Sequence, residues 1–388
     1  MSAGAADPVG ILGRLIACPS VTPDDAGAFD YVVSLLGGAG WRTERITFSD
    51  PGTPDVANLI ATRGEGAPHL AFSGHVDVVP PGDPARWSRP PFSGAVADGY
   101  VHGRGAVDMK GGIAAFIAAA VPFAEGRGGR PGTVTLLLTA DEEGPSVNGT
   151  AKLLDHALKK GMRFDAALVG EPTSRASLGD TVKIGRRGSL SLVLSVSGRQ
   201  GHAAYPHLAD NPVPKIVRLL HRLISIRLDD GSADFPPSNL EVTSVDVGNP
   251  ASNVIPAEAT ARFNIRFNDR WSASRLKEFI RAELDGVAGG GPYKLKVAHE
   301  SESFLTRSDR LIVPLAAAIR EVTGLEPELS TSGGTSDARF FKGICPAIEF
   351  GLVGDTMHKI DERVAIADLL ALTRIYRGFL DRFFDGSA

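Results

Sequence analysis

Five short segments of the 388-residue chain carry histidine and carboxylate side chains in patterns that suit metal binding. They are residues 74–77 (GHVD), 103–108 (GRGAVD), 141–143 (DEE), 170–172 (GEP) and a late loop that contains His358. Several carboxylates that converge in one cleft repel one another unless cations are present. Imidazole and carboxylate ligands without thiolate suit catalytic zinc, and manganese and cobalt are also compatible with them. The segments therefore predict a catalytic metal site.

The number of these side chains is sufficient for two metal ions. Two histidines with three or four acids fit a site in which one carboxylate bridges both ions. Such a site acidifies a bound water and polarises a carbonyl oxygen, and a glutamate that holds no metal can then act as general base. No segment predicts this alone. His-x-Asp occurs by chance, Asp-Glu-Glu is usually a solvated loop, and Gly-Arg-Gly could cradle a phosphate, although Asp108 would repel an anion there. The prediction depends on their joint occurrence.

The elements that must position these residues alternate between strand and helix. Short apolar runs at 70–73, 133–139 and 166–169 are typical of buried parallel strands, and 112–124 and 152–159 indicate helices. This alternation predicts an α/β fold with a mixed, mostly parallel sheet and helices on both faces. Such sheets bind ligands beyond the carboxyl ends of their strands, which is where the candidate residues fall.

A different pattern occupies the middle of the chain. Strand, helix, strand, strand, helix and strand are expected in turn at 183–197, 212–228, 240–247, 259–267, 274–284 and 293–298. This order is that of a ferredoxin-like α+β unit. We therefore predict a catalytic α/β domain in two segments, 1–181 and 296–388. Between them, residues 182–295 form a lid or dimerisation domain.

Composition excludes several other classes of protein. The chain has 41 Lys and Arg against 45 Asp and Glu, a formal net charge of −4, and 43% hydrophobic residues. These values exclude a disordered chain and disfavour a dedicated nucleic-acid binder. The two cysteines, Cys18 and Cys345, fit a reducing cytoplasm. We see no secretory leader and no apolar run near the ~20 residues of a membrane span, so we expect a cytoplasmic protein with a small-molecule substrate.

The chain also matches, in order and over nearly its whole length, the motifs of a known family. These motifs are SGHVDVVPPGDPARWSRPPF, GRGAVDMKGG, DEEG, GEPT, GRRGS, GHAAYPH and SGGTSDARF. Together they resemble the zinc aminoacylase/carboxypeptidase family of metallohydrolases. The resemblance implies a zinc-exopeptidase-like catalytic domain and two zinc ions, with cobalt or manganese possible at one site.

The resemblance implies a role for each candidate ligand. His75, Asp108 and Glu171 match the ligands of one zinc. Glu143 and His358 match those of the second, and Asp108 bridges the two ions.

The resemblance also implies catalytic roles for three residues. Asp77 would hydrogen-bond His75 and fix its tautomer, because residues two apart on a strand face the same way. Glu142 would act as general base. His202 would stabilise the oxyanion in the active site of the partner subunit, which implies a homodimer formed through the inserted domain. Without the resemblance, His202 is more simply a loop histidine beside Tyr205.

The implied reaction is amide hydrolysis, in the best-matching branch the removal of a succinyl group from an N-succinyl diamino dicarboxylate. That substrate has three carboxylates, for which arginines are suitable partners. The candidates are Arg186, Arg187 and Arg266, and the resemblance adds substrate contacts from Tyr205, Asn253, Gly334 and Thr335. Related enzymes can carry an asparagine where this chain has Gly354 and Asp355, which leaves the contacts to the diamino end open. Among the other histidines, His102 is the first to consider because it lies near Asp108.

The sequence is also compatible with three alternatives. A related deacylase, such as an acetylornithine deacetylase, an aminoacylase or a dipeptidase, would use the same metals on another substrate. A metal-binding scaffold without turnover would not need Glu142 beside Glu143. A nucleotide-binding protein is the weakest of the three, because Asp108 stands in the glycine-rich loop.

Overall fold

The computed structural model describes residues 6–289 and 291–386, which form two compact units. The α/β unit contains the chain up to residue 184, residues 306–330 and the chain from residue 336. The insert contains residues 185–305 and 331–335. The sequence predicts that the insert ends at residue 295. That position lies inside β15 (Lys294–Ser301), an outer strand of the insert's sheet, and the unit extends to Leu305 because β16 (Phe304–Leu305) pairs with β9 (Gly185–Arg186) at the start of the unit.

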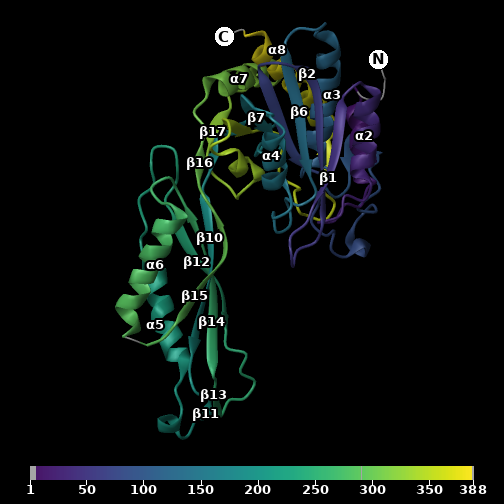
Figure 1. Ribbon diagram of the computed structural model, residues 1–388. Coiled ribbons are helices and arrows are strands. Elements are labelled where there is room, and N and C mark those ends of the chain that lie inside the picture. Colours follow the sequence, from purple (N-terminus) through teal and green to yellow (C-terminus); the bar gives the residue numbers. More distant parts are fainter. Residues whose placement is uncertain (1–5, 290, 387–388) are drawn as a thin grey trace. The chain divides into compact units, whose positions relative to one another are not determined.

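An eight-stranded mixed sheet forms the centre of the α/β unit (Figure 1). In spatial order its strands are β1 (Arg42–Phe48), β2 (Val56–Glu65), β6 (Gly132–Thr139), β3 (His69–His75), β7 (Ala166–Val169), β18 (Ala347–Glu349), β8 (Thr181–Lys183) and β17 (Glu328–Ser330). The pairs β6–β3, β3–β7, β7–β18 and β8–β17 are parallel, and the other neighbours are antiparallel. The predicted mixed, mostly parallel sheet is confirmed.

Helices cover both faces of this sheet. On one face α3 (Lys110–Gly126) packs against α1 (Pro8–Ile16) and α8 (Ile366–Asp385), and α7 (Asp309–Thr323) packs against α8. On the other face α4 (Thr150–Lys159) contacts β2 and β6. Helix α2 (Ala28–Gly38) packs against β1, β2 and α1. Helix α3 is apolar on nearly every side because it is buried on nearly every side.

A small three-stranded sheet joins two loops of the α/β unit. It pairs β5 (Tyr100–His102) with both β4 (Ala95–Ala97) and β19 (Arg363–Ala365). The strand β5 precedes Asp108, and β19 follows His358. This pairing therefore brings together two loops that lie about 250 positions apart in the sequence.

The insert is a four-stranded antiparallel sheet with helices on one face. The strands β10 (Gly188–Ser197), β12 (Asn239–Asp246), β14 (Glu258–Phe267) and β15 lie in the spatial order β12-β14-β10-β15. This is the strand order of the predicted ferredoxin-like unit. Its core contains apolar residues from the sheet, from α5 (Pro212–Ile224) and from α6 (Ala273–Ala288), such as Leu192, Phe263, Ile216 and Leu276.

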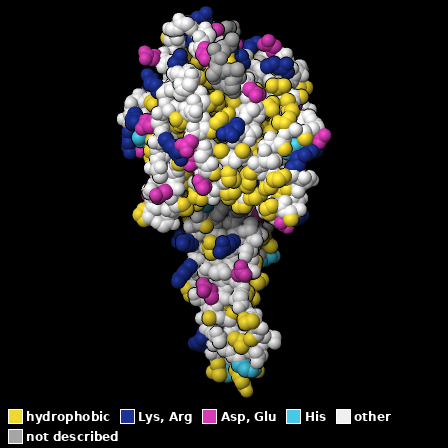
Figure 2. All heavy atoms as spheres, turned by 90° about the vertical axis from the view of Figure 1, so that its right-hand side faces the viewer, with side chains coloured by type: hydrophobic (Ala, Val, Ile, Leu, Met, Phe, Trp, Pro, Cys, Tyr) yellow, Lys and Arg dark blue, Asp and Glu magenta, His cyan; other side chains and the backbone are white. Residues whose placement is uncertain are grey.

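The surface of the α/β unit carries charges of both signs. On the face shown in Figure 2, basic and acidic side chains are interspersed, and neither sign forms a continuous patch. This face therefore offers no basic surface of the kind that nucleic-acid binders carry. Among the described residues, no helix combines the length and apolar character that crossing a bilayer requires.

A buried tyrosine links α8 to the central sheet. The Tyr376 hydroxyl donates a hydrogen bond to the carbonyl oxygen of Phe350 just after β18, with an O···O distance of 2.6 Å. Both residues are fully buried. We expect Tyr376→Phe to lower the free energy of unfolding by about 1–3 kcal/mol, because the carbonyl loses its donor where water cannot replace it. Urea denaturation followed by circular dichroism measures this loss.

Tyr100→Phe is the matched control. Tyr100 is only partly buried, and its hydroxyl has no hydrogen bond among the residues that the structure describes. This substitution should change the free energy of unfolding by less than about 0.5 kcal/mol. Equal losses in the two variants would contradict a structural role for the Tyr376 hydroxyl.

Candidate metal centre

Loops at one edge of the central sheet bring the five predicted ligands together. His75 is the last residue of β3, and Asp108 lies in the loop before α3. Glu143 follows β6, Glu171 follows β7, and His358 lies between β18 and β19. The side chains form two groups of three that share Asp108, and within each group the potential ligand atoms lie within 4.8 Å of one another.

The shared aspartate lies between two imidazole rings. Asp108 Oδ1 is 3.2 Å from His75 Nε2, and Asp108 Oδ2 is 3.1 Å from His358 Nε2. Glu171 Oε1 lies 3.7 Å from the same His75 nitrogen, and Glu143 Oε1 lies 2.9 Å from the same His358 nitrogen. One carboxylate thus offers one oxygen to each group, which is the geometry that a bridging ligand needs.

The acidic side chains favour protonation of both histidines. Burial of His75 opposes its protonation, but the hydrogen bond to Asp108 and the nearby charge of Glu171 raise its pKa well above the ordinary value. Hydrogen bonds to Asp108 and Glu143 raise the pKa of His358 to about 10. Burial opposes ionisation of Asp108, but the two imidazoles hold its pKa below the usual range. Because a histidine ligand must be neutral, a cation would displace these protons and take their place.

Asp77 orients His75 through its main chain. The sequence predicts that the Asp77 carboxylate holds the imidazole, yet His75 Nδ1 lies 2.9 Å from the Asp77 carbonyl oxygen and 3.6 Å from Oδ1. The carboxylate accepts hydrogen bonds from the Thr22 hydroxyl (2.6 Å) and from the backbone N–H groups of Glu143 (3.0 Å) and Glu142 (3.3 Å). Strand β3 ends at His75, so the strand alternation behind the prediction does not reach Asp77.

Glu142 lies beside the predicted ligands, as a general base must. Burial raises the pKa of its carboxyl well above the ordinary value, and the charge of Glu171 raises it further. A carboxyl group with a raised pKa is better matched to proton transfer near neutral pH. Glu142 also forms a group within 4.8 Å with His75 and Glu143, so it lies near enough to ligate as well.

Glu362 was not predicted from the sequence, although it joins the two halves of the centre. It is fully buried, and its carboxylate accepts a hydrogen bond from Arg104 Nη1 at 2.7 Å. It also accepts three from backbone N–H groups of residues 105–108 at 2.9–3.2 Å, including that of Asp108. The only signal in the sequence is an acid four residues after His358, which on its own indicates a solvated loop.

Three of the predicted residues lie together in the insert. His202 belongs to β11 (Gly201–His202), which pairs with β13 (Val254–Ile255), and the next backbone N–H, that of Ala203, donates to the Asn253 carbonyl oxygen at 2.8 Å. The Tyr205 ring centroid lies 5.5 Å from that of His202, and all three side chains are exposed. His202 Nδ1 accepts a hydrogen bond from the Ala204 N–H at 3.0 Å, which leaves Nε2 to donate.

The remaining substrate candidates also belong to the insert. Arg186 Nη1 donates to the carbonyl oxygen of Gly334 at 3.2 Å, and Thr335 is the next residue. Arg187 and Arg266 are partly buried, and each has a buried guanidinium nitrogen with no hydrogen-bond partner among the described residues. Burial lowers the pKa of both side chains, and the charge of Arg266 lowers that of Arg187 further.

Three other residues considered in the sequence belong to none of the ligand groups among the described residues. His102 lies in β5 with its Nε2 3.3 Å from the Ala97 carbonyl oxygen, and it belongs to none of the ligand groups found among the described residues. In the His358 loop, Gly354 donates its N–H to the Ser174 carbonyl oxygen at 3.1 Å, and Asp355 is exposed.

The donor set shows which metals suit this centre. It consists of imidazole nitrogens and carboxylate oxygens, and neither cysteine belongs to a ligand group. Zinc, cobalt and manganese accept such donors. The residues therefore fit two ions of this class that share Asp108.

Comparison with known proteins supports the resemblance at full length. The chain is 55% identical over 383 residues to a succinyl-diaminopimelate desuccinylase of Rhodospirillum centenum, covering 99% of both chains. It is 56% identical over 384 residues to one of Methylobacterium nodulans, covering 98% of this chain and 97% of the relative.

Solved structures show the same fold at low identity. An M20 family metallo-carboxypeptidase from Sulfolobus solfataricus matches with a TM-score of 0.80 and 18% identity, covering 98% of this chain and 99% of that one. A dinuclear metal binding peptidase of the M20 family from Bacillus subtilis matches with a TM-score of 0.69 and 16% identity, covering 96% of both chains.

The predicted family resemblance is thereby confirmed. The sequence model of peptidase family M20/M25/M40 matches residues 71–382, which include all five predicted metal ligands. The chain therefore belongs to peptidase family M20/M25/M40.

Proposed function

We propose that this chain is a metal-dependent amide hydrolase that converts N-succinyl-L,L-2,6-diaminopimelate to succinate and L,L-diaminopimelate, a step of lysine and cell-wall biosynthesis. The observation that carries the chemistry is the position of Asp108 between two ligand groups. The substrate is inferred from two relatives more than half identical over nearly the whole chain, which favours it over an acetylornithine deacetylase or an aminoacylase. The two unpaired cysteines favour the cytoplasm as the place of this reaction.

We assign His75, Asp108 and Glu171 to one ion and Asp108, Glu143 and His358 to the other. Zinc is the proposed metal, with cobalt or manganese possible at one position. When bound, two such ions acidify a water and polarise the carbonyl group of the scissile amide.

The residues of the chain then supply the proton transfers. Glu142 accepts a proton from the attacking water and gives it to the departing amine, which needs a carboxyl group that holds a proton near neutral pH. Asp77 keeps Glu142 and Glu143 in place through their backbone N–H groups. The Asp77 carboxylate accepts hydrogen bonds from both backbone N–H groups, so the backbone of the two glutamates is held while we assign their side chains different roles.

The insert offers partners for the carboxylates of the substrate. Arg187 and Arg266 lie close enough for the charge of one to lower the pKa of the other, and each retains an unpartnered buried nitrogen. A carboxylate would satisfy both, since guanidinium groups bind carboxylates in pairs of hydrogen bonds. We assign further contacts to Arg186, Tyr205, Asn253, Gly334 and Thr335.

We also propose that the chain forms a homodimer through the insert, with His202 of one subunit stabilising the oxyanion in the other subunit's site. Val217 and Val287, from α5 and α6, line an open groove of about 750 Å³. Val217 is 54% exposed, and Ile224 on the same helix is 62% exposed. Apolar side chains exposed together in this way mark surfaces that bind other proteins.

A pair of glutamate variants separates the base from a ligand. Glu142→Gln keeps the shape of the side chain but cannot accept the proton, so we expect kcat to fall by about 10²-fold or more with metal content unchanged. Glu143→Gln should lose bound metal. Elemental analysis beside steady-state kinetics measures both effects. Metal loss in Glu142→Gln with retention in Glu143→Gln would reverse the two assignments.

Two substrates test the proposed reaction directly. The metal-loaded chain should hydrolyse N-succinyl-L,L-diaminopimelate with kcat/KM about 10²-fold or more above that for N-acetylornithine, because the latter lacks the succinyl carboxylate and a second amino-acid end. Amine release measured at equal enzyme concentration gives both constants. Equal or faster hydrolysis of N-acetylornithine would favour the alternative deacylase.

A mixed dimer tests the role of His202. In a heterodimer of His202→Ala and Glu142→Ala chains, one of the two sites has both an intact base and an intact donated histidine. Random assortment of inactive homodimers should therefore recover about a quarter of the unmodified activity in a twofold-symmetric enzyme. Absence of recovery in a preparation shown to contain heterodimers would exclude donation across the interface.

A further inference from the structure

A cavity of the α/β unit lies at the opposite edge of the central sheet from the candidate metal centre. Its lining includes the last residues of β2, the first residues of β6 and the loop after α3. The metal centre lies beyond the other end of β6. The eight residues of β6 place the two sites roughly 25 Å apart, at about 3.3 Å per residue. The cavity is therefore distinct from the centre described above.

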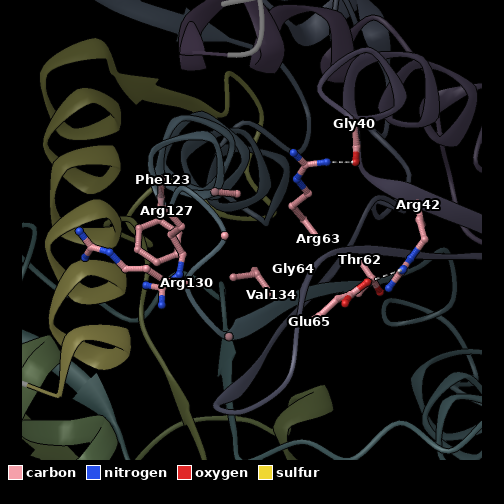
Figure 3. Close-up of a pocket in the computed structure, with 13 residues that line it drawn as sticks. Gly40, Arg42, Thr62, Arg63, Gly64, Glu65, Phe123, Arg127, Arg130 and Val134 are labelled. Atoms are coloured by element: carbon pink, nitrogen blue, oxygen red, sulfur yellow. Dashed lines mark hydrogen bonds and ion pairs between the residues drawn. The ribbon is translucent and has the colours of Figure 1, made fainter.

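The lining of this cavity is strongly basic. The cavity has a volume of about 400 Å³, within the range of small-molecule sites. Four arginines and one acid, Glu65, line it. Figure 3 shows Arg127 and Arg130 on one side of the cavity and Arg63 and Arg42 on the other, with Gly64 and Val134 between them.

Few of these charges are neutralised by acids. Arg63 Nη1 donates to the Gly40 carbonyl oxygen, and Arg127 Nη2 donates to the Pro131 carbonyl oxygen at 2.6 Å, so both use a hydrogen bond on a neutral group. Arg42 Nη1 lies 3.9 Å from Glu65 Oε1, and both side chains are largely exposed.

One further carboxylate reaches the group from α8. Asp385 Oδ1 lies 3.5 Å from Arg127 Nη1 and 3.6 Å from Arg130 Nη1, so these two arginines share one acid. Four guanidinium groups thus face two carboxylates, Glu65 and Asp385, and two positive charges are left over.

The position of Arg127 is fixed before any ligand arrives. Its guanidinium carbon lies 5.3 Å from the ring centroid of Phe123 and 4.9 Å from that of Phe384. Its Nε is buried and has no hydrogen-bond partner among the described residues. A guanidinium held between two rings loses little side-chain entropy when it binds an anion.

We propose that this pocket binds a small molecule with two or more anionic groups, phosphate or carboxylate. Phosphate and carboxylate groups match the paired N–H donors of arginine. An anion with two such groups would bridge the Arg127–Arg130 side and the Arg42–Arg63 side. This site does not depend on the proposed hydrolysis, so it is a second binding function of the chain.

Calorimetric titration of the metal-loaded chain with two probes tests the proposal. Inorganic pyrophosphate represents phosphate ligands, and propane-1,2,3-tricarboxylate represents carboxylate ligands. We expect saturable binding of at least one probe, and at least about tenfold weaker binding in the double variant Arg42→Gln/Arg130→Gln, since two ionic contacts are lost. Binding should also weaken as salt rises. The preferred probe identifies the class of ligand.

Controls distinguish this pocket from the metals and from misfolding. Arg42 and Arg130 are 72% and 67% exposed, so their replacement should leave thermal unfolding unchanged. Arg320→Gln is the matched control, because Arg320 is 57% exposed, lies in α7 and pairs with Glu326. It should bind both probes like the unmodified chain. Failure of both probes to bind, or binding that the double variant retains in full, would overturn the proposal, the latter by assigning the anion to another site.

Discussion

Mutual repulsion among carboxylates is the constraint around which the α/β unit is built. Asp77, Asp108, Glu142, Glu143 and Glu171 all come to one edge of the central sheet. Asp108 resolves part of the conflict by giving one oxygen to each of two histidines. Against the effect of burial, the surrounding acids raise the pKa values of His75 and His358, and the two imidazoles hold that of Asp108 below its usual range. Positive charge near these carboxylates, from imidazole or from bound cations, therefore offsets their mutual repulsion.

Two buried acids provide that framework through the backbone. Asp77 receives the N–H groups of Glu142 and Glu143, and Glu362 receives those of the Asp108 loop. Hydrogen bonds from N–H groups to a carboxylate are stronger than those between neutral groups. Each acid therefore holds a loop that strand geometry alone would leave free, and each joins segments that are distant in sequence. The positions of the predicted ligands thus depend on two buried acids, Asp77 and Glu362, that hold the backbone of their loops.

Local patterns in the sequence predict much of this structure, because they report on one element at a time. The apolar run at 166–169 coincides with β7, and the alanine-rich run at 112–124 falls within α3. Four of the five predicted ligands lie within four residues of such an element, so local patterns point to them: His75, Asp108, Glu143 and Glu171. Glu362 was not predictable, since its burial depends on the pairing of β5 with β19, and no local pattern reports a contact over that separation. Asp77 contacts His75 through its carbonyl oxygen, which every residue has, so the residue type does not reveal that contact.

The order of strands in the central sheet also has a consequence for how the chain is made. Strand β18 lies between β7 and β8, yet it is synthesised more than 160 residues after both of them. While the ribosome is producing the insert, β18 has not yet been made, so the edges of β7 and β8 that pair with it are open. Open strand edges of this kind promote aggregation. Nascent chains that stop before residue 347 therefore expose both edges, and early folding of the insert, whose first and last residues pair with each other, shortens the connection from β8 to the later strands.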